Sequence, residues 1–490
     1  MKIKRIKRSG FLSSALVALS FLFTTQLAAQ DSRPNFVYII GDDISQEDFG
    51  CYGHPTIRTP NVDLLAATGM RFDNAYLSTS QCSPSRCSII TGRYPHNAGS
   101  PELYQYFGPE QVVFPELLKN AGYYTAQSGK WHLGKEPKRG FTFTKEKKTG
   151  AGGEDFWVQV LQERPKDKPF FMWFAAHDAH RGWNPDKDGK PHTREEVVVP
   201  PYLYDCPEMR DDLAKYYDEI QRFDRYIGLV VDELKKQGVY ENTCIIVMAD
   251  NARAFPRCKV RLYDSGLKTP FVVNWPAKVK GGQVCESLVS SIDVAPSLIE
   301  AAGLKSPVNF QGVSFEPLLK DPTTRTREFV FGEHNWHGHI GHERMVRKGD
   351  YVYIRNAHPE LIQFHSSGRD DPGIPYFELA NAGKLKPEQM DSILQPRPSE
   401  ELFKLSNDPN QFANLAGNPE YSQVLKEMQA AMDEWQQRTG DTVPVLKDAT
   451  PDKSDRITNA VLIKGARPKG DFDYPGKSTQ ANLINDPGPR

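Results

Sequence analysis

Three short apolar runs in the first half of the chain are each followed directly by polar residues. Residues 35–40, 170–176 and 244–249 are continuously hydrophobic, which is typical of parallel strands buried on both faces. In order, they are followed by Asp42 and Asp43, by His177 to His180, and by Asp250 and Asn251. In α/β folds, ligands bind beyond the carboxyl ends of such strands, so we expect these groups to converge.

Helical patterns alternate with the apolar runs. One helix is predicted after Thr59, with Pro60 at its first position and Gly69 as its stop, and a longer amphipathic helix is predicted over 213–234. Strands alternating with helices predict an α/β fold with a mostly parallel sheet. We expect this domain to span residues 30–340.

The pattern changes after about residue 340. Residues 344–355 read as two short strands around a turn, and residues 421–435 form an amphipathic helical pattern that begins after Asn418-Pro419. These elements predict a small α+β subdomain over residues 341–440. Residues 441–490 lack periodicity and are predicted to be an extended tail.

The first 29 residues have the pattern of a signal peptide. A basic start is followed by an apolar stretch over 11–23 and by small residues near Ala29. We expect export to the periplasm or the medium, with a retained N-terminal anchor as the alternative. No later stretch has the roughly 18 apolar residues that a membrane span needs.

Composition narrows the choice of partners. The 490 residues include 61 Lys+Arg and 62 Asp+Glu, a formal net charge of −1, which argues against a strongly basic nucleic-acid binder. Seven cysteines are too few for a disulfide-built scaffold. Their odd number leaves at least one thiol free, intermolecular or modified in an oxidising compartment.

Cys82 begins the segment Cys-Ser-Pro-Ser-Arg-Cys-Ser-Ile-Ile-Thr-Gly, which ends at Gly92. Pro84 suits a first helical turn and Gly92 a helix stop, so Cys82 is expected at a helix N-terminus, where the helix dipole and Arg86 favour an anion. Taken alone, the segment also fits a buried cysteine before an ordinary helix.

Several motifs together resemble a known family. Cys-Ser-Pro-Ser-Arg86, then Thr91-Gly92, then Gly-Lys130-Trp-His132, with the early Asp42-Asp43 and the later Asp250-Asn251, resemble the type I sulfatases of the alkaline phosphatase superfamily. His177-Asp-Ala-His-Arg181 and Phe255-Pro256 resemble its sulfamidase (N-sulfoglucosamine sulfohydrolase) branch and bacterial polysaccharide sulfatases. The resemblance implies an alkaline-phosphatase-like sandwich fold.

The resemblance also implies a mechanism. Cys82 would be oxidised to formylglycine (3-oxoalanine) by a maturation enzyme, and of the two hydroxyls of its hydrate one attacks sulfur while the other later expels sulfate. Its implied catalytic residues are Cys82, Arg86, Lys130, His132 as the base, His180 as the acid, and Lys259. Asp42, Asp43, Asp250 and Asn251, with the oxygen of residue 82, offer hard oxygen ligands that suit Ca²⁺, or Mg²⁺ as second choice.

The chain departs from the family pattern at two places. Ala252-Arg253 replaces the Gly that usually follows the Asp-Asn pair, so Arg253 is a candidate substrate contact, and Gln81 stands where an apolar or small residue is commoner. Lys268 is a second candidate for the sulfate contact if Lys259 points elsewhere.

Residues 332–342 (GEHNWHGHIGH) place four histidines around Trp336, and we expect a Gly-punctuated loop. His334 and His337 are candidate substrate contacts, because a Trp ring can cover a sugar face and imidazoles can bind hydroxyls or sulfates. A second metal site and a merely solvated loop are the alternatives.

The main prediction is therefore an exported sulfatase that removes sulfate groups, chiefly O-sulfate esters, from a sulfated polysaccharide or its oligosaccharides. A sulfamidase, a phosphonate or phosphodiester hydrolase of the same superfamily, and a non-catalytic sulfated-glycan binder are the alternatives. The glycan and the position of its sulfate stay open.

Overall fold

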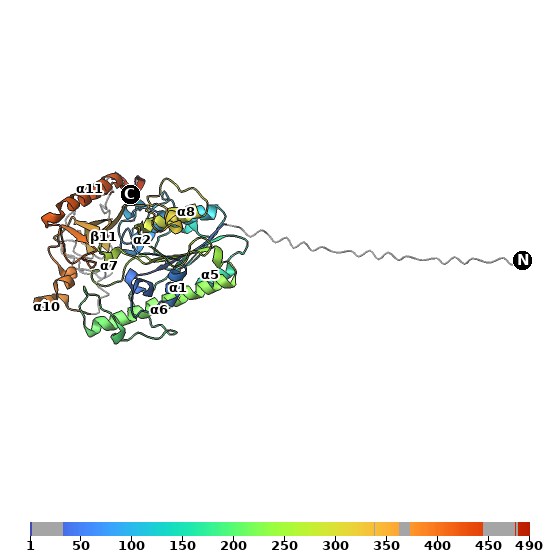
Figure 1. The fold of residues 1–490 in the computed structure, drawn as a ribbon, viewed down its shortest axis with the longest axis horizontal. Coiled ribbons are helices and arrows are strands. Elements are labelled where there is room, and N and C mark those ends of the chain that lie inside the picture. Colours follow the sequence, from blue (N-terminus) through green and yellow to red (C-terminus); the bar gives the residue numbers. More distant parts are fainter. Residues whose placement is uncertain (2–32, 338, 362–372, 444–475, 477–478) are drawn as a thin grey trace. The chain divides into compact units, whose positions relative to one another are not determined.

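The predicted apolar runs are neighbouring parallel strands. The computed structural model describes residues 1, 33–337, 339–361, 373–443, 476 and 479–490 (Figure 1). In it, β1 (Asn35–Gly41) lies between β6 (Phe170–Ala175) and β7 (Thr243–Ala249), and Ile40 is opposite both Ala175 and Met248. The three strands therefore end at one edge of the sheet.

These strands are the centre of an eight-stranded sheet with the order β5-β4-β6-β1-β7-β8-β2-β9. All its neighbouring strands are parallel except β7 with β8 and β8 with β2. The predicted α/β class with a mixed, mostly parallel sheet is confirmed. The remaining strands are β2 (Met70–Phe72), β4 (Tyr124–Gly129), β5 (Phe143–Lys145), β8 (Phe271–Asn274) and β9 (Gln283–Cys285).

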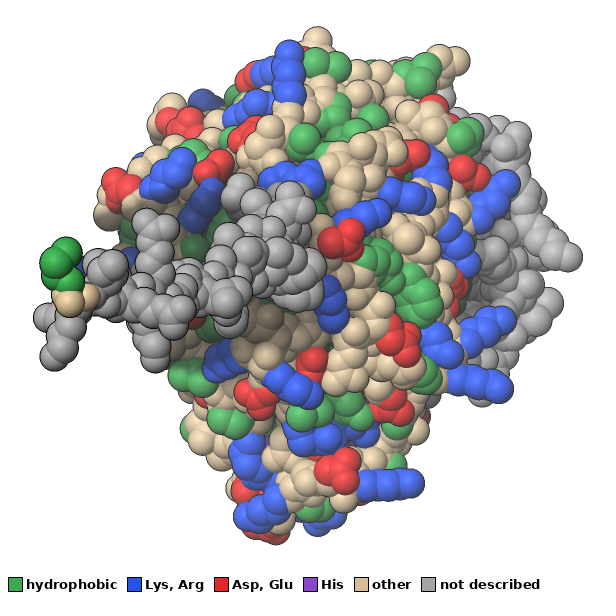
Figure 2. Space-filling model, turned by 90° about the vertical axis from the view of Figure 1, so that its right-hand side faces the viewer, with side chains coloured by type: hydrophobic (Ala, Val, Ile, Leu, Met, Phe, Trp, Pro, Cys, Tyr) green, Lys and Arg blue, Asp and Glu red, His purple; other side chains and the backbone are tan. Residues whose placement is uncertain are grey.

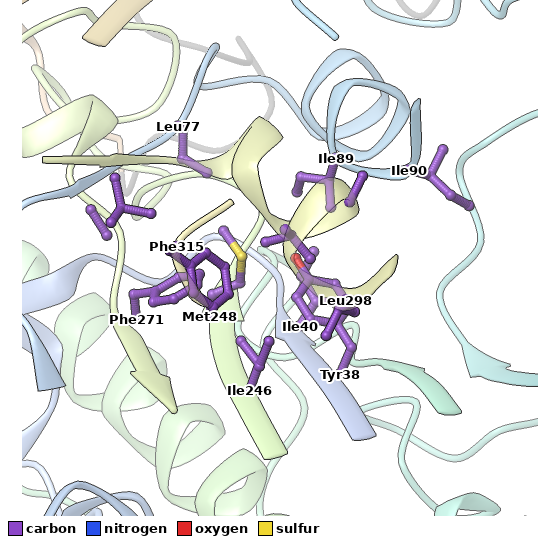
Figure 3. Close-up of a cluster of buried hydrophobic side chains, with 14 of the residues drawn as sticks. Tyr38, Ile40, Leu77, Ile89, Ile90, Ile246, Met248, Phe271, Leu298 and Phe315 are labelled. Carbon is purple, nitrogen blue, oxygen red and sulfur yellow. The ribbon is translucent and has the colours of Figure 1, made fainter. Parts of the chain in front are cut away.

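Alternate residues of the central strands enter two different cores. Val37 and Ile39 pack with α1 (Pro60–Thr68), α5 (Trp157–Glu163) and α6 (Pro207–Lys236), which Figure 1 shows on one side of the sheet. Tyr38 and Ile40 belong to the core on the other side, which includes residues of α2 (Cys82–Thr91), α4 (Phe114–Asn120) and α8 (Val294–Ala301). Figure 3 shows both side chains in one cluster with Ile89 of α2 and Leu298 of α8. Burial on both faces explains why these strands are continuously hydrophobic.

A second, antiparallel sheet follows in the chain. It consists of β11 (Phe329–His337), β12 (His339–Lys348), β13 (Tyr351–Asn356) and β14 (Glu400–Lys404), and α11 (Ser422–Thr439) packs on it through Met432 and Trp435. The predicted strand pair at 344–355 and the helix at 421–435 are confirmed. The predicted boundary between residues 340 and 341 lies inside β12, because β11 was not recognised as a strand.

The short elements complete the fold. β3 (Ala75–Tyr76) pairs with β10 (Val289–Ser290), and the remaining described α-helices are α3 (Pro95–Ala98), α7 (Asp264–Leu267), α9 (Glu316–Lys320) and α10 (Tyr376–Asn381). None of the described helices is long and apolar enough to cross a membrane. Basic and acidic side chains are interspersed on the face shown in Figure 2.

The sequence predicts a signal peptide at the start of the chain and an extended tail at its end. The predicted signal peptide at 1–29 lies outside the described residues, apart from Met1. Of the predicted extended tail, residues 479–490 instead pack on the folded chain, where the guanidinium of Arg93 donates hydrogen bonds to Asn482, Ile484 and Asn485. The tail residues 444–475 and 477–478 lie outside the described residues. Residues 482–485 are bound to Arg93 mainly through backbone carbonyls, and such contacts leave no hydrophobic period in the sequence.

Candidate functional site

Four parallel strands deliver polar side chains to one edge of the large sheet. Parallel strands end on the same side, so residues that follow them lie close together even when they are far apart in the chain. The backbone confirms this closeness, since Asp42 N donates to Asp178 O at 2.8 Å and Lys130 N donates to Ala175 O at 2.8 Å. The polar residues that follow β1, β4, β6 and β7 are Asp42 and Asp43, Lys130 and His132, His177 to His180, and Asp250 and Asn251.

Cys82 is the first residue of α2 and faces the two aspartates. Its Sγ lies 3.7 Å from Asp42 Oδ1 and 4.0 Å from Asp43 Oδ1. Gln81 precedes the helix in an extended conformation, and Gly92 ends it with φ of 63°, as the sequence predicts. All ten helical residues are buried, and burial raises the pKa of the Cys82 thiol to about 12.

Three buried cations neutralise the carboxylates of this group. Arg86 Nε donates to Asp250 Oδ2 at 2.7 Å, and Lys130 forms an ion pair with Asp42. Lys259 Nζ lies 2.6 and 2.8 Å from the two carboxylate oxygens of Asp43. Three carboxylates thus face three cations in a space closed to solvent, where unpaired charges would be costly.

The cations also set the protonation of the aspartates. Burial alone would raise the pKa of Asp42, but Lys130, His180 and Arg86 together hold it well below its usual value. For Asp250 burial dominates and raises the pKa of the carboxyl to about 7, against the opposing effect of Arg86.

The donor set fits a hard cation. Ligand atoms of Asp42, Asp43 and Cys82 lie within 4.8 Å of one another, the one such group of His, Cys, Asp or Glu among the described residues. Asn251 Nδ2 donates to Asp43, whereas its buried Oδ1 has no hydrogen-bond partner among the described residues. An oxygen without a partner beside three carboxylates suits Ca²⁺ or Mg²⁺.

Two histidines lie at the open side of the group. Neither ring nitrogen of His132 has a hydrogen-bond partner among the described residues, and burial, followed by Lys130, lowers its pKa to about 2, so the ring is neutral. His180 is exposed, and its charge would act directly on Asp42. A neutral imidazole can accept a proton, and an exposed one can deliver a proton to a bound molecule.

Two candidate contacts lie outside this group. Arg253 is buried and pairs with Glu47 at 2.7 Å and Asp48 at 2.9 Å instead of facing the cluster. Lys268 acts electrostatically on Asp264, and no contact joins it to Asp42, Asp43 or Cys82 among the described residues. Of the two lysines considered for the sulfate contact, the structure therefore places Lys259 in the group.

The predicted His-rich loop is wrong, because residues 332–337 belong to the buried strand β11 and residues 339–342 to β12. Gln81 Nε2 lies 2.5 Å from His334 Nδ1, and Glu333 contacts His96 Nδ1 at 2.5 Å. These strand residues are buried through hydrogen bonds between polar side chains, so their sequence does not show the hydrophobic alternation that is typical of a strand. His337 is 8% exposed and His342 2%, so neither belongs to a solvated loop.

A metal site at these histidines is not found among the described side chains. His342 Nε2 is 3.8 Å from Asp441 Oδ1, and burial lowers its pKa to about 3. The side chain of His339 lies outside the described residues.

Sequence reasoning missed two residues at the site. The Tyr104 ring is 5.1 Å from the His132 ring, is 42% exposed, and its backbone N donates to Ser83 Oγ. Arg222 of α6 holds Asp178 through two hydrogen bonds. The sequence contains one indication of the role of Arg222, because this arginine lies between Ile220 and Phe223 on the buried face of an amphipathic helix. No sequence pattern indicates the position of Tyr104.

Comparison with known proteins agrees with this geometry. The family model described as sulfatase matches residues 34–151 and 154–304, and the model described as N-sulphoglucosamine sulphohydrolase, C-terminal, matches residues 258–371. An ulvan-active sulfatase of Formosa agariphila is 28% identical over 84% of this chain and 76% of its own length. The human N-sulphoglucosamine sulphohydrolase is 29% identical over 84% of this chain and 91% of its own length.

Solved structures share the fold. BT4656 in complex with its substrate D-glucosamine-2-N,6-O-disulfate aligns with a TM-score of 0.64 at 21% identity, covering 83% of this chain and 98% of the other. Ps i-CgsB in complex with k-i-k-neocarrahexaose aligns with a TM-score of 0.63 at 21% identity, covering 82% and 92%. With a family model matched over more than half of its length and the expected residues gathered at one edge of the sheet, the chain belongs to the sulfatase family of hydrolases.

Proposed function

We propose that this sulfatase removes sulfate groups, chiefly O-sulfate esters, from a sulfated polysaccharide or its oligosaccharides outside the cytoplasm, in the periplasm or the medium. The observation that carries the proposal is the position of Cys82, with Sγ 3.7 Å from Asp42 and 4.0 Å from Asp43 at a buried helix N-terminus. Relatives that act on ulvan and on glucosamine sulfates support the glycan class.

The proposal assigns a modification and a metal to this position. Cys82 is proposed to be converted to formylglycine by a maturation enzyme, which supplies a hydrated aldehyde as nucleophile in place of the thiol. Asp42, Asp43, Asp250 and Asn251 would hold Ca²⁺, or Mg²⁺ as second choice, which would acidify the nucleophile and neutralise sulfate charge.

The chain's own residues then bind and orient the substrate. Arg86, Lys130 and Lys259 bring three positive charges to a space closed to water, where charge on the sulfate oxygens is stabilised most strongly. His132 is neutral and accepts a proton at a ring nitrogen. His180, on the exposed rim, donates a proton to the leaving oxygen.

A second candidate function is sulfamidase activity. It is favoured by the match of residues 258–371 to the C-terminal model of N-sulphoglucosamine sulphohydrolase. The two activities use the same cluster and differ in whether the bond from sulfur to oxygen or to nitrogen is cleaved.

The experiment is a desulfation screen with the protein coexpressed with a maturation enzyme. Release of sulfate from defined O-sulfated and N-sulfated oligosaccharides is compared with hydrolysis of an aryl phosphate diester, and Cys82→Ala is the control. Mass spectrometry of the tryptic peptide Phe72–Arg86 reports whether residue 82 has lost its sulfur. Preferred diester hydrolysis, or an unmodified Cys82 with glycan binding and no turnover, would contradict the proposal.

A further inference from the structure

A cavity lined by several charged residues shares no residue with the Cys82 group. Its volume is about 510 Å³, and it lies between the segment that leads into β10, the segment that leads into β11, and the turn from β12 to β13. The residues that matter for its chemistry are Arg325, Thr326, Arg327, Glu328, Arg347 and Lys348. Nothing in the mechanism above uses this cavity.

The lining of the cavity is basic. Five basic and two acidic residues line it, although acidic and basic residues are nearly balanced over the whole chain. Two of the basic side chains are compensated, because Lys348 pairs with Glu328 at 2.9 Å and Arg327 binds Asp293 through two hydrogen bonds. Arg325 is exposed and forms no hydrogen bond or ion pair with a described residue. The cavity therefore keeps a local excess of positive charge.

Arg347 is a buried residue of the cavity lining. It is 7% exposed, its guanidinium carbon lies 5.0 Å from the centre of the Tyr76 ring, and its Nε donates to Gly349 O at 3.2 Å. Its Nη1 forms an ion pair with Asp264 Oδ2 at 3.6 Å, a separation too long for a hydrogen bond. Burial lowers the pKa of Arg347 to about 10, against the opposing effect of Asp350.

Two buried donors of this lining lack an acceptor. Arg347 Nη1 and Thr326 Oγ1 are both buried and have no hydrogen-bond partner among the described residues. Buried polar atoms in folded proteins are nearly always hydrogen-bonded, and both residues line the cavity, so a ligand that accepts hydrogen bonds could satisfy these donors after a small movement of the side chains. A tetrahedral oxyanion offers several acceptors, and its negative charge would pair with Arg325.

We propose that this cavity binds a sulfate group of the polymeric glycan, at a second site separate from the Cys82 group. The proposal rests on the proposed function for the identity of the polymer. A chain that carries several sulfates could then occupy both sites, and the second contact would raise its apparent affinity without taking part in hydrolysis. Short substrates that reach only the Cys82 group would not gain from it.

The test measures binding without turnover. Full-length Cys82→Ala protein is titrated with dextran sulfate by calorimetry, alone and with Arg347→Gln or Arg325→Glu added, and unsulfated dextran reports sulfate-independent binding. We expect either added substitution to weaken dextran sulfate binding by about tenfold, the effect of losing one charge-assisted contact. Arg194→Gln is the matched control, because Arg194 is an exposed arginine that pairs with Asp211 and does not line the cavity.

Two outcomes would overturn the proposal. Unchanged dextran sulfate affinity in both cavity variants would overturn it, as would a cavity that binds inorganic sulfate through Arg347 while the polymer affinity is independent of Arg347. Because Arg325 is exposed, Arg325→Glu keeps the test valid if Arg347→Gln does not fold. In the protein with Cys82 restored, both variants should hydrolyse a small aryl sulfate normally, so failure of the second site is distinguishable from failure of the proposed function.

Discussion

Gln81 Nε2 lies 2.5 Å from His334 Nδ1, although 253 positions separate the two residues in the sequence. The contact joins the residue just before Cys82 to β11, and Glu333 N donates to Ser78 O at 2.9 Å beside it. The antiparallel sheet is therefore attached directly to the segment that leads into α2, the helix that begins at Cys82. Gln81, which departs from the family pattern, has a partner that explains it.

His334→Ala is expected to reduce kcat/KM by about tenfold, and by a similar factor for a small aryl sulfate and for an oligosaccharide. The loss leaves the buried Gln81 amide without its partner, at a cost of about 1 to 3 kcal/mol. A substrate-binding role for His334, as the sequence suggests, would instead reduce kcat/KM far more for the oligosaccharide than for the aryl sulfate. His334→Gln, which keeps a hydrogen-bonding group, should recover part of the activity. A loss confined to the oligosaccharide would show instead that His334 contacts substrate.

Cys82→Ala is expected to lower turnover by roughly ten-thousand-fold or more, with little change in melting temperature. The side chain is small and its loss removes the proposed nucleophile rather than core volume. Cys87→Ser, in the same buried helix, is the control: it should keep kcat within a few-fold and cost about 1 to 2 kcal/mol of stability by burying a hydroxyl. Full activity in Cys82→Ala would refute the mechanism.

Chelation is expected to inactivate the enzyme, and Ca²⁺ should restore activity better than Zn²⁺, because the proposed ligands are all oxygens. Elemental analysis of Asp42→Ala and Asp250→Ala should find the bound metal lost. Asp48→Asn is a matched control, since Asp48 is equally buried but pairs with Arg253 outside the cluster. Stoichiometric zinc in the active protein would contradict the ligand assignment.

Arg222→Gln is expected to lower kcat by about ten- to a hundredfold with KM little changed. Arg222 binds the Asp178 carboxylate, while the backbone N and O of Asp42 are hydrogen-bonded to Asp178 and Ala179. The arginine therefore positions both Asp42, a proposed metal ligand, and the segment that carries His180. Breaking this buried pair should also cost about 3 to 5 kcal/mol of stability.

Arg222→Lys provides the comparison for that loss. A lysine keeps the charge but not the two-pronged contact, and it should recover stability more than kcat. Wild-type kcat in folded Arg222→Gln would show that the pair serves stability alone.

Arg93→Met is expected to lower the free energy of unfolding by about 3 kcal/mol or more, because several partly buried hydrogen bonds from this buried arginine to residues 482–485 are lost. Arg438→Met removes an exposed contact to Asp486 in the same segment and should cost under about 1 kcal/mol. Denaturant titration of both variants measures the difference. Equal costs would mean that Arg93 does not anchor the segment.

The parts that the sequence predicted are those in which local pattern and tertiary role agree. β1, β6 and β7 are buried on both faces and read as apolar runs, so their polar ends located Asp42, Asp43, Asp250 and Asn251 without further information. The helix that begins at Cys82 followed from Pro84 and Gly92 in the same way.

The parts that it missed depend on partners far along the chain. β11 is buried through polar contacts with Gln81 and His96, so it has no hydrophobic period and was taken for a loop. Whether Lys259 or Lys268 contacts Asp43 depends on the path of the backbone, which spacing along the chain does not specify. Arg222 and Tyr104 reach the site through contacts with residues far away in the sequence. Spacing along the chain does not contain that information.

The burial of Cys82 limits when this residue can be modified. Only 2% of the residue is exposed, and the helix that it begins is buried along its whole length. A maturation enzyme must bind the segment around Cys82 in its own active site, and the folded protein does not expose that segment. Under the proposed function, Cys82 therefore has to be converted before the chain folds. Molecules that fold before conversion keep the thiol and stay inactive. The specific activity of a preparation then depends on growth temperature and on the amount of maturation enzyme as well as on the sequence.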